Sequence, residues 1–427
     1  MRWREVELGD VCDRVTVGHV GPMAAEYLPN GIPFLRSKNV REYRIVSEDL
    51  RFVSADFHQR LKKSRLVPGD VVIVRTGTPG TAAVIPPGIK EANCSDLVVV
   101  TPGPGLLSHF LAYYLNAAAH RQIDSAIVGA VQQHFNVGSA RKLRIPLPPM
   151  AEQAAIVTVL RHLDDKIELN REMNRTLEVL AQAIFRSWFV DFDPVVAKAE
   201  GREPFGMDAD TAALFPDRFV DSELGPIPEG WEVCGVGDIA ELHRVMVDPG
   251  ALAPDTPYVG LEHIPRQAMT LDTWGQASDV MSGKTTFKQG HVLFGKLRPY
   301  FHKVVRAPFA GVCSTDVLVI RPVFPEDSGF VLHTAASSAF VAHADAGSSG
   351  TRMPRARWEH MQRFRVVRPP KPLSARFSSI ASDLIGLAEA NTRESLTLTS
   401  LRDLLLPKLL SGEIRVPEAA EMVEDVA

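Results

Sequence analysis

The chain repeats itself with a shift of 221 residues, and this repeat limits the possible folds more than any other feature. Pro148-Pro149 and Pro369-Pro370 stand at this shift, each after a short apolar run. Upstream the shift changes slightly, as loop insertions would cause: Asp96-Leu97-Val98-Val99 matches Asp316-Val317-Leu318-Val319. An internal repeat in a chain of 427 residues predicts two similar modules in place of one globule.

After each proline pair, apolar residues recur every three or four positions, from Ile156 to Trp188 and from Phe377 to Leu409. This spacing predicts two helices, each about 50 Å long. A rod with one apolar stripe must pair, and the other copy is the obvious partner, so we expect an antiparallel coiled coil. The positions expected in the helix seam are Ile156, Val159, Leu163, Asn170, Leu177, Leu180 and Ile184, with Phe377, Ile380, Leu384, Asn391, Leu398, Leu401 and Leu405 opposite.

Two features of these helices are left open by the sequence. Asn170 and Asn391 are either buried in the seam, where an asparagine can fix the pairing register, or simply exposed. Pro407 should kink or close the second helix near its end.

The modules are expected to be mixed α/β, because short β-branched runs such as Val71–Val74 and Val317–Ile320 alternate with a helical stretch, Leu107 to Ala119. The fold class is therefore α/β (mixed α+β), with a pseudo-twofold internal repeat. The expected boundaries are modules at 1–150 and 231–371, helices at 151–190 and 372–412, a linker with room for a short helix at 191–230 and a frayed acidic tail at 413–427.

Composition places the chain among ordinary soluble proteins, with 45% hydrophobic and 23% charged residues. No apolar run approaches the roughly 18 residues of a membrane span, and the start lacks a signal peptide, so a cytoplasmic location is expected. Four cysteines have no C-x-x-C spacing and are expected to be reduced thiols: Cys12, Cys94, Cys234 and Cys313.

Positive charge is concentrated in particular stretches although the net charge is −4. No acid occurs between Asp279 and Asp316, a stretch rich in lysine, arginine and aromatic residues. A second basic cluster runs from Arg352 to Arg368 and is broken only by Glu359. Such stretches suit phosphate neutralisation, but a solvated charged face is the other interpretation, and composition alone leaves both open.

No catalytic constellation is visible. Gly283-Lys284-Thr285 lacks the upstream glycine of a Walker A loop. Asp164-Asp165-Lys166 looks like a nuclease D-x-K, but it lies on the first long helix, where solvent-facing charges are expected. The histidines form no H-E-x-x-H and have no cysteines at metal spacing, so no metal site is expected.

Several motifs together carry a family resemblance. Pro146-Leu147-Pro148-Pro149, the following Glu152-Gln153 and Leu163 to Asn170 are typical of a central spacer helix, and Ser187 to Pro194 of its exit. Leu224 to Trp231 and Leu405 to Ile414 match the entry to a second domain and the end of a distal helix. Over nearly its whole length the chain resembles the specificity (S) subunit of a type I restriction-modification system.

The resemblance implies that residues 1–150 and 231–371 are target recognition domains and that the two helices are spacers. The two domains resemble different subtypes, which implies an asymmetric bipartite DNA site whose gap is set by the helices. The chain would be non-catalytic. Its partners would be double-stranded DNA, two methyltransferase (modification) subunits and restriction/translocase subunits. S-adenosylmethionine, ATP and Mg would bind to those partners, with no cofactor in this chain.

The second helix departs from the family pattern, because it opens Pro370-Lys371-Pro372-Leu373-Ser374 without a Glu-Gln pair. Its start, and any partner contact there, is therefore left open.

The candidate DNA-binding residues come from the loop motifs of the two domains. Arginine suits guanine edges and glutamine suits adenine, so four residues are expected to read bases: Gln132, Gln133, Arg352 and Arg355. The residues expected on the DNA backbone are Arg75, Thr78, Lys296, Arg298 and Lys303. Each has a structural alternative, such as an internal ion pair for Arg352 or apolar packing for the stem of Lys296.

Two other functions compete with DNA recognition. A two-lobed protein-interaction scaffold would use the helices for partners and leave the basic loops incidental. A self-sufficient enzyme would need a catalytic centre that the sequence does not show.

Overall fold

The computed structural model describes residues 3–125, 135–350 and 352–424, and the chain divides into two compact units. Unit 1 comprises residues 1–167 and 396–427, and unit 2 comprises residues 168–395. Each long helix therefore contributes one part to each unit.

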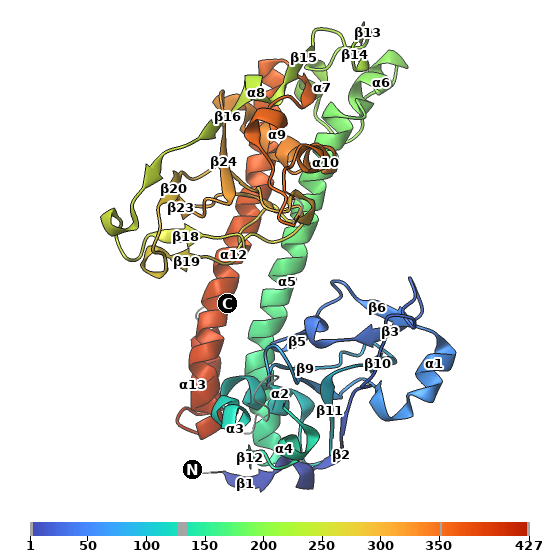
Figure 1. Ribbon diagram of the computed structural model, residues 1–427, viewed down its shortest axis with the longest axis vertical. Helices are drawn as coiled ribbons and strands as arrows, with labels where there is room; N and C mark the ends of the chain where they lie inside the picture. Colours follow the sequence, from blue (N-terminus) through green and yellow to red (C-terminus); the bar gives the residue numbers. More distant parts are fainter. Residues whose placement is uncertain (1–2, 126–134, 351, 425–427) are drawn as a thin grey trace. The chain divides into compact units, whose positions relative to one another are not determined.

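Unit 1 holds the first module (Figure 1). Its edge strand β1 (Arg4–Glu7) pairs antiparallel with β12 (Arg144–Leu147), which leads into the first long helix. Two four-stranded sheets follow, in the orders β2-β11-β8-β9 and β6-β3-β10-β7. Their strands are β2 (Cys12–Val17), β11 (Leu97–Pro102), β8 (Val71–Val74), β9 (Ala82–Val84), β6 (Arg51–Val53), β3 (Ile32–Leu35), β10 (Ala92–Cys94) and β7 (Arg65–Leu66), and the helices are α1 (Ala55–Arg60), α2 (Ser108–Ala117), α3 (His120–Ser125) and α4 (Val137–Arg141).

Unit 2 holds the second module. Here β15 (Glu232–Gly235) pairs antiparallel with β25 (Arg365–Arg368), again directly before a long helix. The two sheets have the orders β16-β24-β21-β22 and β17-β20-β23-β18-β19. Their strands are β16 (Ala240–His243), β24 (Val317–Pro322), β21 (Val292–Gly295), β22 (Val304–Arg306), β17 (Met246–Val247), β20 (Lys284–Phe287), β23 (Gly311–Cys313), β18 (Pro257–Val259) and β19 (Gly275–Gln276), and the helices are α8 (Val236–Ile239), α9 (Ser328–Ala335), α10 (Ser338–Ala346) and α11 (Trp358–Met361).

The two modules share one framework, which confirms the predicted repeat and the mixed α/β class. β2-β11-β8-β9 and β16-β24-β21-β22 are both antiparallel and have the same order. The second sheet of each module contains one parallel pair, β3 with β10 and β18 with β23. Runs such as Val71–Val74 are fully buried, because both faces of these short strands are covered.

The two long helices are α5 (Met150–Phe189) and α12 (Lys371–Ser411), and they pack antiparallel (Figure 1). In unit 1 the first part of α5 packs on the last part of α12, with Ile156 and Leu163 in one core with Leu398 and Leu405. In unit 2 the end of α5 packs on the start of α12 through an aromatic cluster that includes Phe185, Trp188 and Phe377.

The polar positions of the seam are buried. Asn170 is 1% exposed, and its amide donates to the main-chain oxygen of Asn391 at 3.3 Å and to Glu394 at 2.7 Å. Asn391 donates to Asn174 at 3.0 Å. These bonds are satisfied only at one axial register of the two helices, which is the role that the sequence left open for the two asparagines.

The other expected seam residues are buried or half-buried, except for Leu180. Leu180 is 47% exposed, and the neighbouring Ala181 takes the buried position. The reason is periodicity: a strict repeat of three and four drifts around a straight helix of 3.6 residues per turn, so one position of the stripe falls outside the seam.

Two expectations outside the modules differ from the structure, and one of the two effects expected of Pro407 does not occur. Residues 191–230 hold more structure than the expected linker with a short helix: α6 (Asp193–Ala199), α7 (Ala209–Ala213) and a hairpin of β13 (Phe219–Ser222) and β14 (Gly225–Pro228) pack there, and Val195 and Phe215 are buried in the core of unit 2. The acidic tail is not frayed, since α13 (Val416–Glu424) buries Ala419 and Val423 in the core of unit 1. Of the two effects expected of Pro407, closure at the proline itself does not occur, because α12 continues to Ser411.

Asp164 is also not the solvent-facing charge that its helical position suggested. It accepts hydrogen bonds from Tyr113 on α2 at 2.5 Å and from Arg402 on α12 at 2.8 Å. Arg402 is 8% exposed, and its guanidinium lies 4.4 Å from the ring centre of Tyr43. This group joins the first module to both helices within unit 1.

A buried carboxyl group joins α5 to the second module. Glu178 accepts from the main-chain nitrogen and the hydroxyl of Thr270 at 2.7 and 2.6 Å, and burial raises the pKa of Glu178. A carboxyl group with a raised pKa favours the folded state while it is protonated, and this contribution is lost as pH rises through the folded-state pKa.

We therefore expect Glu178→Gln to be at least as stable as the wild type at pH 8, because the amide oxygen keeps both bonds without burying a charge. The difference should narrow at about pH 4, below the ordinary pKa of a glutamate carboxyl, because a carboxyl group with a raised pKa is protonated there. Thermal unfolding at both pH values measures it, with the exposed Glu172→Gln as the matched control. A Glu178→Gln protein that is less stable than the wild type at pH 8 would contradict this prediction.

Candidate nucleic-acid interface

Two basic segments of the second module, far apart in sequence, meet at one loop surface. The first is residues 296–298, directly after β21, and the second is residues 349–350 and 352–357, directly before α11. The main-chain nitrogen of Arg298 donates to Pro354 at 2.7 Å, and that of Ala356 donates to Lys296 at 2.9 Å. An antiparallel bridge also joins Leu297 to Arg355. The predicted residues Lys296, Arg298, Arg352 and Arg355 therefore share one surface, which we call the basic loop surface.

The four side chains differ in how free they are. Arg352 is exposed and has no hydrogen bond or ion pair with any residue that the structure describes. Arg355 is 44% exposed and donates through Nε to Asp316 at 2.9 Å, which raises the pKa of Arg355. Arg298 has φ of 52°, and its guanidinium lies 5.8 Å from the ring centre of Phe301. An Arg in the left-handed region is uncommon, and the main-chain bond to Pro354 helps to hold it there.

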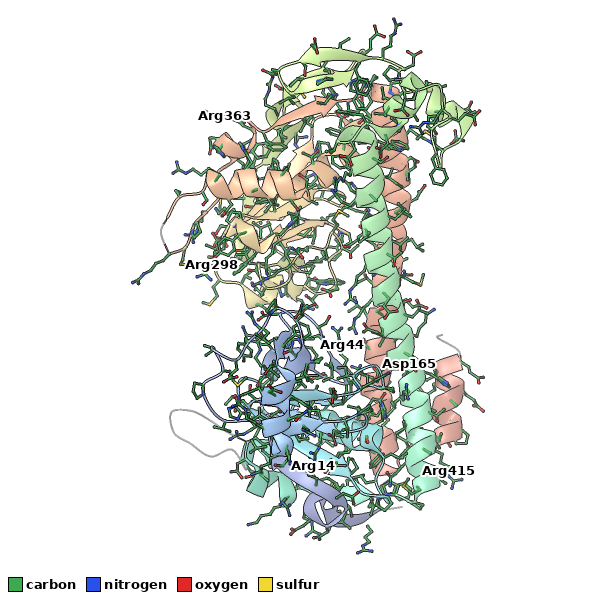
Figure 2. All side chains as sticks on the ribbon, turned by 90° about the vertical axis from the view of Figure 1, so that its right-hand side faces the viewer. Arg14, Arg44, Asp165, Arg298, Arg363 and Arg415 are labelled. Atoms are coloured by element: carbon green, nitrogen blue, oxygen red, sulfur yellow. The ribbon has the colours of Figure 1, made fainter. Side chains whose placement is uncertain are left out.

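Figure 2 shows Arg298 on the side of the second module that is away from α5 and α12. Arg363 lies on the same side, on the turn after α11. The long helices α5 and α12 therefore do not cover Arg298.

The cluster from Arg352 to Arg368 does not act as one surface. Arg365 pairs with Glu223, and Arg368 pairs with the fully buried Asp327 at 2.7 Å. Asp327 also accepts from Ser374 near the start of α12. Arg365 thus pairs with the segment before the module, and Arg368 neutralises a buried carboxylate within it.

Lys303 is more engaged within its own module than the other basic candidates. Its ammonium group donates to the main-chain oxygen of Leu261, and burial lowers the pKa of Lys303. Lys296, which has no side-chain partner in the described part of the chain, is the better phosphate candidate in this module.

The first module has a corresponding loop after β8. Arg75 pairs with Asp96 at 3.3 Å and donates to the main-chain oxygen of Phe135 at 3.2 Å. Thr78 is exposed in the glycine loop. Gly80 has φ of 93°, and a Cβ there would lie 2.8 Å from Ile123, so the loop requires glycine at this position. Gln132 and Gln133 lie outside the described residues.

The sequence analysis missed two aspartates that contact these arginines. Asp96 directly precedes β11 and Asp316 directly precedes β24, so they occupy equivalent positions of the repeat. Both were quoted only as markers of the repeat. The signal that could have found them is an acid retained at one repeat position beside basic loops.

Other kinds of site find no support. Across the described part of the chain, no three His, Cys, Asp or Glu side chains gather where they could hold a metal ion. Among the helices of residues 3–125, 135–350 and 352–424, none combines the length and hydropathy of a membrane-spanning segment. All four cysteines are free thiols.

The structure combines two repeated β modules, basic loops and paired helices. These are the features expected of a modular nucleic-acid-binding protein. Residues 1–179 match the family model described as "Type I restriction modification DNA specificity domain". The chain is 24% identical to the type I restriction enzyme MjaIX specificity subunit of Methanocaldococcus jannaschii, over 92% of this chain and 89% of that protein. It is also 24% identical to the HindI specificity subunit of Haemophilus influenzae, over 65% of this chain and 70% of that one.

The fold matches the crystal structure of a type I restriction-modification system S subunit from M. genitalium, with a TM-score of 0.52 and 14% identity over 96% of both chains. Residues 1–179 thus match this DNA specificity domain, and most of the chain is similar to type I restriction-modification specificity subunits.

Proposed function

We propose that this chain recognises an asymmetric bipartite DNA site, with residues 1–150 and 231–371 as the two target recognition domains. The supporting observation is that one β framework carries two unlike sets of basic loops. In the first module the arginine paired with the aspartate follows β8, whereas in the second module it comes from the segment before α11. Equivalent frameworks with different loops suit two half-sites of different sequence.

The paired helices, residues 151–190 and 372–412, set the unread gap between the half-sites. α5 has 40 residues and α12 has 41, each about 60 Å long, and buried asparagines hold their register. For both domains to approach one face of the duplex, the half-site centres lie about one helical turn, roughly 10 base pairs, apart.

The chemistry belongs to the partners. Two modification subunits would bring S-adenosylmethionine and an adenine-methylating site that needs a flipped base. Restriction subunits would bring ATP and Mg for translocation and cleavage. This chain supplies the choice of DNA sequence for that assembly.

The test is DNA binding by the chain in complex with its modification subunits. We expect log affinity to fall steeply with log salt, because each phosphate contact releases counterions, together with a preference for one split sequence. A protein-interaction scaffold would show neither behaviour. Methyl transfer by the purified chain alone would instead support an enzyme.

Arg352→Ala should relax the sequence preference at a position of one half-site only, because Arg352 is exposed and unpaired among the described residues on a surface that would face base edges. The loss should be about tenfold or more in discrimination. Lys296→Ala should weaken binding to all sequences alike and reduce the salt slope by about one. Binding to randomised duplexes measures both, and equal behaviour of the two variants would reject this division of roles.

A further inference from the structure

One acid lies beside the basic loop surface, and its negative charge would oppose DNA binding. Asp316 is the only Asp or Glu between residues 280 and 325, a stretch that holds Lys296 and Arg298. A carboxylate beside DNA repels phosphates and so opposes binding. Its ion pair with Arg355 has side chains 27% and 44% exposed, and such pairs add little to stability, about 0–1 kcal/mol. Neither DNA affinity nor the stability of the fold therefore explains why an acid stands at this position.

The hydrogen bonds around Asp316 offer another explanation, because they fix both Asp316 and its partner Arg355. Asp316 is fixed at the start of β24, since its main-chain oxygen accepts from Lys296 at 3.0 Å and its main-chain nitrogen donates to Ser314 at 3.3 Å. Arg355 is fixed by reciprocal main-chain bonds with Ser349 at 3.0 and 3.2 Å. The side chain of Arg355 is thus held at its root by Ser349 and at Nε by Asp316.

The remaining end of Arg355 is free. Its two terminal nitrogens have no hydrogen bond to any residue of the described ranges, while the side chain as a whole remains 44% exposed. A guanine presents two acceptors in the major groove, O6 and N7, and arginine reads them with two parallel N–H donors. A guanidinium whose Nε is already bonded can offer only its terminal pair, in one orientation.

The repeat supports the same use of the equivalent position. Asp96 accepts from the side chains of Arg75 and Thr76 in the first module. The acid is thus retained while the arginine comes from a different loop, as expected if its role is to orient whichever arginine the module carries.

We propose that Asp316 is a positioning residue that presents the terminal nitrogens of Arg355 to a guanine edge in the half-site read by the second domain. This inference rests on the proposed function. Asp316 increases discrimination and decreases overall affinity, because it restricts Arg355 while adding a negative charge.

The experiment uses the chain in complex with two modification subunits and a library of randomised DNA duplexes. For Asp316→Asn we expect discrimination at one base pair of one half-site to fall about tenfold, while non-specific affinity is unchanged or higher. The other half-site and the melting temperature should not change. Arg355→Ala should lose the same discrimination but with lower non-specific affinity, and Asp316→Asn should change no discrimination in the Arg355→Ala background.

Glu359→Gln is the matched control, because it removes one exposed acid four residues from Arg355 that pairs with Arg244 instead. It should raise non-specific affinity without changing the sequence preference. An unchanged preference in Asp316→Asn, or loss of the whole half-site, would overturn the positioning role. A wild-type complex with no preference for any split sequence would instead overturn the proposed function.

Discussion

Insertion of four residues into both long helices is expected to move the preferred DNA target to one with a longer gap. Four residues add about 6 Å of helix, close to two base-pair steps of about 3.4 Å each. The affected stretch is Leu163 to Ile184 of α5, together with the facing turns of α12. Affinity for the original target should fall by about 1000-fold, towards non-specific binding, since only one half-site can then be held.

Selection from duplexes with varied gaps measures this effect in the assembled complex. An insertion in α5 alone is the informative control. It would separate Asn170 from Asn391 and its neighbours, so it should destabilise the protein without defining a new gap. If the doubly lengthened protein keeps the original gap, the helices do not set the spacing.

Arg402→Ala is expected to lower the free energy of unfolding of unit 1 by about 3 kcal/mol. The variant leaves Asp164 in a largely buried position with only Tyr113 as a partner, and removal of one member of a buried ion pair is strongly destabilising. The contact of Arg402 with the ring of Tyr43 is lost as well. Thermal or chemical unfolding measures the loss.

The matched control is Arg161→Ala, which breaks an exposed i,i+4 pair with Asp165 at 3.6 Å on the same helix. That pair should contribute less than about 1 kcal/mol. Asp164→Asn combined with Arg402→Ala should be less destabilised than the sum of the two single variants, because no unpaired charge stays buried. Additive effects, or equal losses for Arg402→Ala and the control, would show that this group does not hold the module to the helices.

Features that depend on periodicity could be predicted closely from the sequence. The apolar runs placed β8 and the start of β24, and the stripes placed α5 and α12 within a residue or two, because each depends on a local pattern that survives folding. The failures have specific reasons. The 191–230 segment appeared to be a linker because its Pro and Gly content hides single buried residues such as Phe215.

The sequence predicted which types of residue would form the candidate site, but it predicted the role of each residue only in part. Basic and glycine motifs located Arg298 and Arg352, but the pairing of Arg368 with Asp327 and of Lys303 with Leu261 depends on contacts between distant segments. Charge counts cannot separate an arginine that pairs internally from one that is free. That distinction requires the distance to an acceptor.

By itself the sequence determined the duplicated framework, the two helices and the family resemblance, because repeats and periodicity are properties of residue order. Only the tertiary structure decided that residues 296–298 meet residues 354–356, that Asp316 holds Arg355, and that Asp164 is a largely buried partner of Arg402. The physical reason is that hydrogen bonds and ion pairs need atoms within about 3 Å, and chain folding sets such distances between residues that the sequence separates widely.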